Sequence, residues 1–283
     1  MSLAGRLQRS LIGEVRALFN DAARGEVPVL RGADPIVAAD SVAWRVHGDV
    51  TTMMVGGVAA LLLQMLHPGA LAGVWDHSNF RKDMLGRLRR TARFIAQTTY
   101  AERADAEAAI ARVRHIHAHV GGVLQDGTPY RADDPHLLSW VHVAGSICFL
   151  DAWIRFGEPA MSRADQDRYF TDVAPVAFAL GADRVPMTRA EADALILSYR
   201  AELVADVRSR EIARIVLDQK PTSLRAAPVQ SLVMQAAVDL LPRWAREMHG
   251  LRASVVTRPA VEAATFGLAS TLRWAFASDG YRR

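Results

Sequence analysis

The sequence predicts an all-α fold, a single helical domain. Apolar residues recur at helical spacing along almost the whole chain, and alternating strand patterns bounded by turn residues are absent. Of the 283 residues, 51% are hydrophobic, which is enough to bury one large core. The loops are short, with no Ser/Gly-rich linker and no internal repeat, so we expect residues 1–283 to form one domain.

Breaks in the apolar pattern divide the first half of the chain into five expected helices. Gly25-Glu26-Val27-Pro28 ends the first helix, His67-Pro68-Gly69 ends the third, and a loop at 76–80 precedes the fourth. Gly121-Gly122 is expected to cap the fifth. The third is the most apolar, but its roughly 14 residues fall short of the ~20 that a bilayer crossing needs, so it predicts a buried helix. The five helices are expected at 7–23, around Trp44 and His47, and at 53–66, 84–99 and 101–120.

Capping residues mark the helices of the second half. A proline opens the first of them, and Gly157-Glu158-Pro159 ends it. Capping boxes at Ser162-Arg163-Ala164-Asp165 and Thr188-Arg189-Ala190-Glu191 begin two more. A loop between Pro221 and Pro228 precedes the C-terminal helices. The helices are expected at 135–156, 163–180, 189–207, 232–248 and 261–277.

Charge and cysteine content exclude several function classes. The net charge is +4, but there is no run of five or six like charges, so we expect no nucleic-acid partner. Cys148 is the only cysteine, which excludes an internal disulfide and a cysteine-based zinc site. Residues 1–18 mix charged and apolar residues and do not resemble a signal peptide. We therefore expect a cytoplasmic protein without a transmembrane segment, although peripheral membrane contact stays open.

Two neighbouring expected helices carry the residues best suited to a cofactor site. Arg87 and Arg90 are three residues apart on one helix, and Arg114 and His117 are three apart on the next, so each pair shares a helix face. Arginine suits the bidentate binding of a carboxylate, and a histidine on an apolar face is a candidate metal ligand. Thr91 adds a hydroxyl. A solvated basic face and a hydrogen-bonded core histidine are the alternatives, and the spacing alone does not choose.

The other histidines allow different interpretations. His115 and His119 lie on one helix face, about 200° from His117, and would form a zinc-like pair if two more ligands were supplied. No nearby carboxylate in the sequence offers itself. His67 and His77 flank loop breaks and are expected to be structural hydrogen-bond partners. His142, on an apolar helix, is expected to be a satisfied core histidine.

A series of motifs then gives the chain a family resemblance. Together they are similar, in order and spacing, to the family that contains latex-clearing protein (rubber oxygenase) and the MpaB-type oxygenases. The resemblance covers roughly residues 44–206, with helical extensions on both sides. The motifs are His67-Pro68, Asp76-His77-Ser78, Arg87-x-x-Arg90-Thr91, Arg114-x-x-His117-x-x-Val120-x-Gly122, Trp140-Val141-His142, Leu180-Gly181 and Val185-Pro186.

The resemblance implies a globin-like helical core and a haem b whose iron is bound by His117. It further implies that Arg87 and Arg114 anchor the propionates and that Arg90 and Thr91 line the opposite, distal side as catalytic residues. In the family a lysine can close the second axial position. Here Arg90 stands in its place, and because arginine stays protonated and is a poor metal ligand, the distal position is expected to be open or water-filled.

The substrate is the second departure from the family. Rubber-cleaving members use a distal glutamate, but residues 44–90 contain no glutamate, so polyisoprene cleavage is not carried over. The expected function is that of a haem-dependent oxidoreductase, an oxygenase that uses dioxygen on an apolar small molecule or lipid. The alternatives are a haem or gas-binding protein without turnover, a helical interaction protein that has lost the cofactor, and a metal hydrolase built on the His115 and His119 pair.

Overall fold

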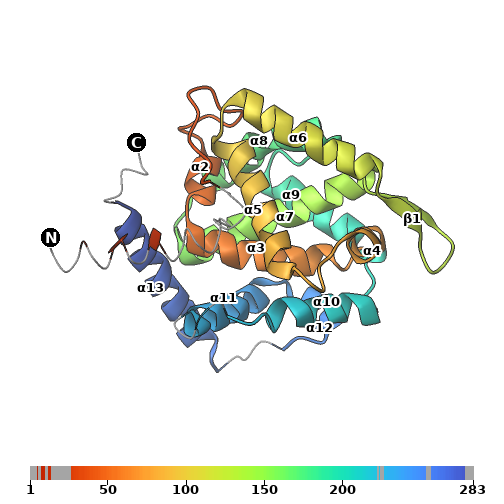
Figure 1. Ribbon diagram of the computed structural model, residues 1–283. Helices are drawn as coiled ribbons and strands as arrows, with labels where there is room; N and C mark the ends of the chain where they lie inside the picture. Colours follow the sequence, from red (N-terminus) through yellow and green to blue (C-terminus); the bar gives the residue numbers. More distant parts are fainter. Residues whose placement is uncertain are drawn as a thin grey trace.

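The computed structural model describes residues 5, 8–9, 12–13, 27–221, 223, 226–252 and 256–277, and it confirms the all-α fold (Figure 1). The helix expected at 7–23 lies almost entirely outside the described residues. The globin-like core stays a prediction. The elements are α2 (Val42–His47), α3 (Val50–Gln64), α4 (Pro68–His77), α5 (Met84–Tyr100), α6 (Arg103–Ala118), β1 (Gly121–Val123), β2 (Pro129–Arg131), α7 (Pro135–Phe156), α8 (Arg163–Leu180), α9 (Arg189–Ser198), the 3-10 turn η2 (Tyr199–Ala201), α10 (Val207–Leu217), α11 (Ala227–Leu240), α12 (Arg243–His249) and α13 (Arg258–Ala277).

The core is built around α3 and α7, which pack closely against each other in the centre of the molecule (Figure 1). Gly56 permits this approach, because a Cβ atom there would lie 2.9 Å from the Cys148 carbonyl oxygen. One cluster of buried apolar residues extends from Val37 to Val261 around the two helices. α6 contributes no residue to this cluster and packs against α5 and α8 at its edge.

Residues distant in sequence complete both ends of α3. At its N-terminus the buried Asp49 side chain accepts a hydrogen bond from the Thr52 amide (2.8 Å) and pairs with Arg273 of α13 (2.8 Å). At its C-terminus, His249 of α12 donates from Nε2 to the Leu62 carbonyl (2.8 Å). The central helix is therefore fixed by the C-terminal part of the chain.

The chain turns sharply where α3 gives way to α4. The two helices are bent by 103° at a short break, and Pro68 occupies the first turn of α4. His67 is the N-cap, and its Nδ1 accepts from the Gly69 amide (3.1 Å). The expected break is confirmed, and after it α4 runs in a new direction while still contributing Ala70, Leu71 and Val74 to the core.

Most of the expected helix boundaries are confirmed, but α4 and α10 are helices that the sequence did not predict, and three of the expected boundaries are wrong. Gly121-Gly122 does not cap α6, which ends at Ala118 with His119 as C-cap; the glycines form β1 and pair antiparallel with β2, a hairpin the sequence did not predict. The helix expected at 189–207 ends at Ser198, and α10 begins at Val207 with Asp206 as N-cap. The helix expected at 232–248 is divided into α11 and α12 at Leu241-Pro242. A residue that precedes a proline, here Leu241, disfavours the helical backbone conformation and adopts an extended one.

α7 is the one described helix that length and composition would allow to cross a membrane; the bent pair α3 and α4 would make a second if counted as one span. Of the apolar window in α7, 72% is buried inside the protein. This degree of burial is typical of a core helix.

Candidate functional site

The middle of α5 is only partly covered by the described core. Between Arg87 and Gln97 every residue of this helix keeps some exposure, although Leu88, Phe94 and Ile95 are apolar and Leu88 packs against the core cluster. The helix begins at the N-cap Asp83, which accepts from the Gly86 amide (2.8 Å). The arginines predicted for a cofactor site lie on this partly exposed segment.

Arg87 is a largely buried cation without an anionic partner among the described residues. Its Nη1 donates to the neutral Ser78 hydroxyl (3.3 Å). Burial, with a smaller contribution from Arg90, lowers the pKa of Arg87 to about 10, so the side chain is still charged at neutral pH. A buried cation of this kind favours the binding of an external carboxylate.

Arg90 and Thr91 face other partners in this structure. Arg90 is exposed and pairs with Asp83 across 3.4 Å at the start of its own helix. The Thr91 hydroxyl donates to the Arg87 carbonyl (3.2 Å), the back-bond expected of a threonine in a helix. Neither contact reaches α6, so the distal roles of these two residues stay predictions.

His117 lies in the last turn of α6 and is half-buried. Its Nδ1 is buried and has no hydrogen-bond partner within the described chain. Burial lowers the pKa of His117, an effect that Asp133 partly opposes, so the imidazole is neutral at pH 7. Arg114, one turn earlier, is exposed and donates from Nη1 to the Ala179 carbonyl of α8 (3.5 Å).

The remaining histidines differ from one another. His115 and His119 are both exposed; their rings lie 4.7 Å apart, and His119 donates from Nδ1 to the His115 carbonyl (2.7 Å). His77 donates from Nε2 to the Gly121 carbonyl (3.1 Å), which confirms its structural role. His142 is not the satisfied core histidine that was expected: its Nε2 is buried without a partner among the described residues, and burial lowers its pKa to about 4.

The residues present fit a haem in two respects. A neutral imidazole such as His117 keeps a lone pair for a metal, and its orphaned Nδ1 leaves the ring uncommitted to any described neighbour. The buried guanidinium of Arg87 offers donors for a carboxylate group. The two side chains lie on helices that pack against each other, α5 and α6.

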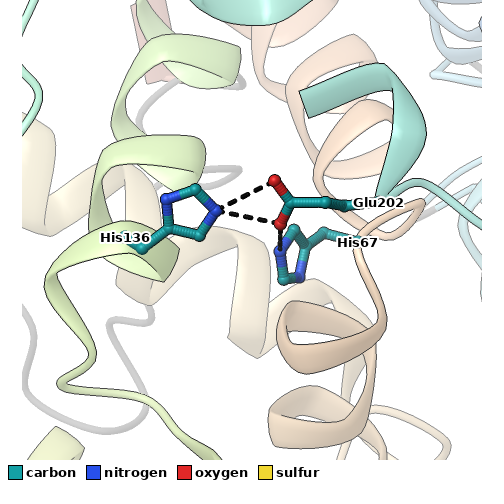
Figure 2. A group of neighbouring side chains, drawn as sticks. All are labelled: His67, His136 and Glu202. Carbon is teal, nitrogen blue, oxygen red and sulfur yellow. Dashed lines mark hydrogen bonds and ion pairs between the residues drawn. The ribbon is translucent and has the colours of Figure 1, made fainter. Parts of the chain in front are cut away.

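A second cluster brings together three side chains that the sequence does not connect (Figure 2). Within the described residues, His67, His136 and Glu202 are the group whose ligand atoms converge, all within 4.8 Å of one another. His136 Nε2 lies 2.9 and 3.1 Å from the two Glu202 carboxylate oxygens, and His67 Nε2 lies 3.5 Å from one of them. The cluster borders a pocket of about 350 Å³.

Sequence reasoning missed this cluster because its members are far apart in the chain. His136 and Glu202 are 66 residues apart. The available local signals were the positions of two histidines at helix starts, His67 as an N-cap and His136 in the first turn of α7 after the N-cap Asp134. Neither signal pointed to Glu202, which follows η2.

Comparison with known proteins is consistent with the motifs. The family described as "ER-bound oxygenase mpaB/B'/Rubber oxygenase, catalytic domain" matches residues 44–274, most of the chain, from α2 into α13. Searches of curated proteins and of solved structures find no match.

Proposed function

Because the chain belongs to the family of MpaB-type and rubber oxygenase catalytic domains, we propose that it is a haem b-dependent oxygenase acting on an apolar small molecule or lipid. The family is one of oxygenase catalytic domains; haem and the substrate class are our proposal. The observation that carries the proposal is the neutral, half-buried imidazole of His117, whose Nδ1 has no described partner.

The chain's own residues would divide the work as follows. Haem, when bound, supplies the iron centre at which dioxygen is activated. His117 would ligate the iron, while Arg87 and Arg114 would bind the propionates. Arg114 can bind a propionate only if it gives up its long hydrogen bond to the Ala179 carbonyl. The charge-assisted hydrogen bond to the propionate would be the stronger of the two.

Arg90 and Thr91 would act on the distal side. The guanidinium of Arg90 would donate hydrogen bonds and, as a poor metal ligand, would not coordinate the iron as a neutral amine could. Its exposed pairing with Asp83 costs little to release. Thr91 would have to give up its hydrogen bond to the Arg87 carbonyl before its hydroxyl proton could serve a ligand.

The proposed substrate class rests on the apolar side chains along α5. Leu88, Phe94 and Ile95 are only partly buried, and they would exclude water from an adjoining reaction site and favour an apolar substrate. Polyisoprene is not proposed, because residues 44–90 contain no glutamate.

The deciding experiment compares His117→Ala with His115→Ala after supplementation with haem. The parent protein and His115→Ala, which changes an exposed residue two positions away, are expected to show a Soret band and about one haem per chain. His117→Ala is expected to lose most of the bound haem or to shift the band. A parent protein without a Soret band would contradict the proposal and favour a helical interaction protein. Dioxygen consumption with a reductant then separates an oxygenase from a gas-binding protein.

A further inference from the structure

We propose that His67, His136 and Glu202 form a binding site for a divalent transition metal of the zinc class, distinct from the residues assigned to haem. Two imidazoles and one carboxylate are a ligand set that zinc takes in proteins, with the remaining positions left to water or a bound anion. The ligand atoms lie within 4.8 Å of one another. Ligands of a tetrahedral zinc are roughly 3.3 Å apart, so small side-chain movements suffice.

The backbone already holds the three side chains in place. His67 is the N-cap of α4, His136 lies in the first turn of α7, and Glu202 follows η2. All three side chains point toward a common centre, with Glu202 reaching between the two rings (Figure 2). An ion at that centre would join three segments of the chain.

Tyr199 supplies the second contact that a zinc-binding histidine needs. Its hydroxyl donates to the His136 carbonyl (2.7 Å), so the hydroxyl oxygen is free to accept from His136 Nδ1, which is 3.3 Å away. A proton on Nδ1 fixes the tautomer in which Nε2 offers its lone pair. His136 Nε2 is the ring atom that donates to Glu202 in the structure, so binding of the ion releases the Nε2 proton to solvent.

His67 must change its proton position to join the site. In the structure its Nδ1 accepts from the Gly69 amide, which places the proton on Nε2. That Nε2 is buried and makes no hydrogen bond within the described chain, although it lies 3.5 Å from Glu202. Metal binding moves the proton from Nε2 to Nδ1 and exchanges the contact with Gly69 for a metal bond.

The position of the cluster allows an ion to enter. It borders the pocket of about 350 Å³, whose lining also includes Asp126, Asp134 and Arg131. The Arg131 charge is paired with Asp133 (2.6 Å), so the two carboxylates make the electrostatic potential of the pocket more negative, which favours a cation. His136 and Glu202 are each 42% exposed, so the site is open to solvent on one side.

The test is equilibrium dialysis of the full chain, without affinity tag, against Zn²⁺, with metal analysis. The parent protein is expected to bind one Zn²⁺. His136→Gln and Glu202→Gln are expected to weaken binding at least 10-fold, and Tyr199→Phe about 10-fold through the orientation of His136. The control, His115→Gln with His119→Gln, removes the exposed histidine pair and is expected to keep the parent affinity.

Three results would overturn the site. They are no Zn²⁺ uptake by the parent protein, loss of uptake in the His115 and His119 control, and full uptake by Glu202→Gln. If the cluster variants do not fold, as judged by circular dichroism, X-ray absorption on the control protein decides. Two imidazoles and one carboxylate at the zinc support the site, and any other shell rejects it. An unchanged Gly69 amide resonance on zinc binding would also reject His67 as a ligand.

Discussion

At the scale of single residues, Arg87 connects sequence to function most directly. Its guanidinium is charged and largely buried, and its described hydrogen bond goes to the neutral hydroxyl of Ser78. The neighbouring charge that helps to lower its pKa belongs to another arginine, Arg90. A residue such as Arg87 contributes little to the stability of the empty protein, because its desolvation is not offset by an anion. Its contribution is expected when a carboxylate binds.

Replacing Arg87 should therefore separate stability from binding. For Arg87→Met we expect the haem-free protein to keep its free energy of unfolding or gain about 1 kcal/mol, and the haem affinity to fall roughly 10-fold, or about 1.4 kcal/mol. Urea denaturation and haem titration measure the two effects. Arg112→Met, at an exposed position of α6, is the control. A variant that is destabilised yet binds haem normally would show that Arg87 is structural.

His47 predicts how stability depends on pH. Its ring lies between the Thr99 and Tyr169 hydroxyls, 2.9 and 3.0 Å away, and burial lowers its pKa from 6.5 to about 4. Between these pH values the unfolded chain binds a proton that the folded protein does not, so stability is lost as the pH falls through this window. The full loss from this one residue is about 3 kcal/mol.

The measurement is urea denaturation of the haem-free protein at pH 7 and pH 4.5. His47→Gln is expected to reduce the difference between the two free energies of unfolding by about 2 kcal/mol. If the parent protein is equally stable at both pH values, the burial of a neutral histidine is contradicted.

At the scale of elements, the sequence predicted helices well where the start is encoded locally. Ser162 and Thr188 cap α8 and α9 as expected, each accepting a hydrogen bond from the amide three residues later. The predicted end of α9 was wrong because a tertiary contact follows it in the structure. The hydroxyl of Tyr199, the residue after the helix, donates a hydrogen bond to the His136 carbonyl. The glycines at 121 and 122 were misassigned because their small size serves contact with Tyr130 in the hairpin.

The close contact between α3 and α7 leads us to expect opposite effects on stability when two adjacent glycines, Gly56 and Gly57, are replaced. A Cβ at Gly56 would lie 2.9 Å from the Cys148 carbonyl oxygen, whereas one at Gly57 would lie 3.7 Å from the Phe149 ring. We expect Gly56→Ala to destabilise the protein by about 1–3 kcal/mol through overpacking. Gly57→Ala should be neutral or stabilising by up to about 1 kcal/mol, because alanine favours the helix. Thermal denaturation of both variants measures this, and equal effects would contradict the close approach.

At the scale of the whole molecule, one ion pair links residues 224 positions apart. Asp49 is 4% exposed at its side chain and Arg273 is 24% exposed. Removing the arginine leaves a buried carboxylate without this cation, so Arg273→Ala is expected to lower the free energy of unfolding by about 2–3 kcal/mol. Arg258→Ala, at an exposed position of the same helix, should change it by less than about 0.5 kcal/mol. Chemical denaturation compares the two, and equal losses would contradict a role for the ion pair.

The candidate sites show where sequence reasoning ends. His117, Arg114, Arg87 and Arg90 became candidates because helical spacing places each pair on one face, and the family resemblance implies a role for them; that role stays a prediction. His67, His136 and Glu202 come together only because the fold places the break before α4, the start of α7 and the residue after η2 next to one another. No local pattern encodes that meeting, so three-dimensional structure was needed to find it.

The fixing of α3 at both ends has a consequence for synthesis on the ribosome. The central helix is made early, but the partners of Asp49 and of the Leu62 carbonyl are Arg273 and His249. Nascent chains that still lack these residues leave the Asp49 carboxylate and the last turn of α3 without these partners. We therefore expect the core to close only after α13 has emerged from the exit tunnel, with α3 protected from aggregation until then by its contact with α7 or by chaperones.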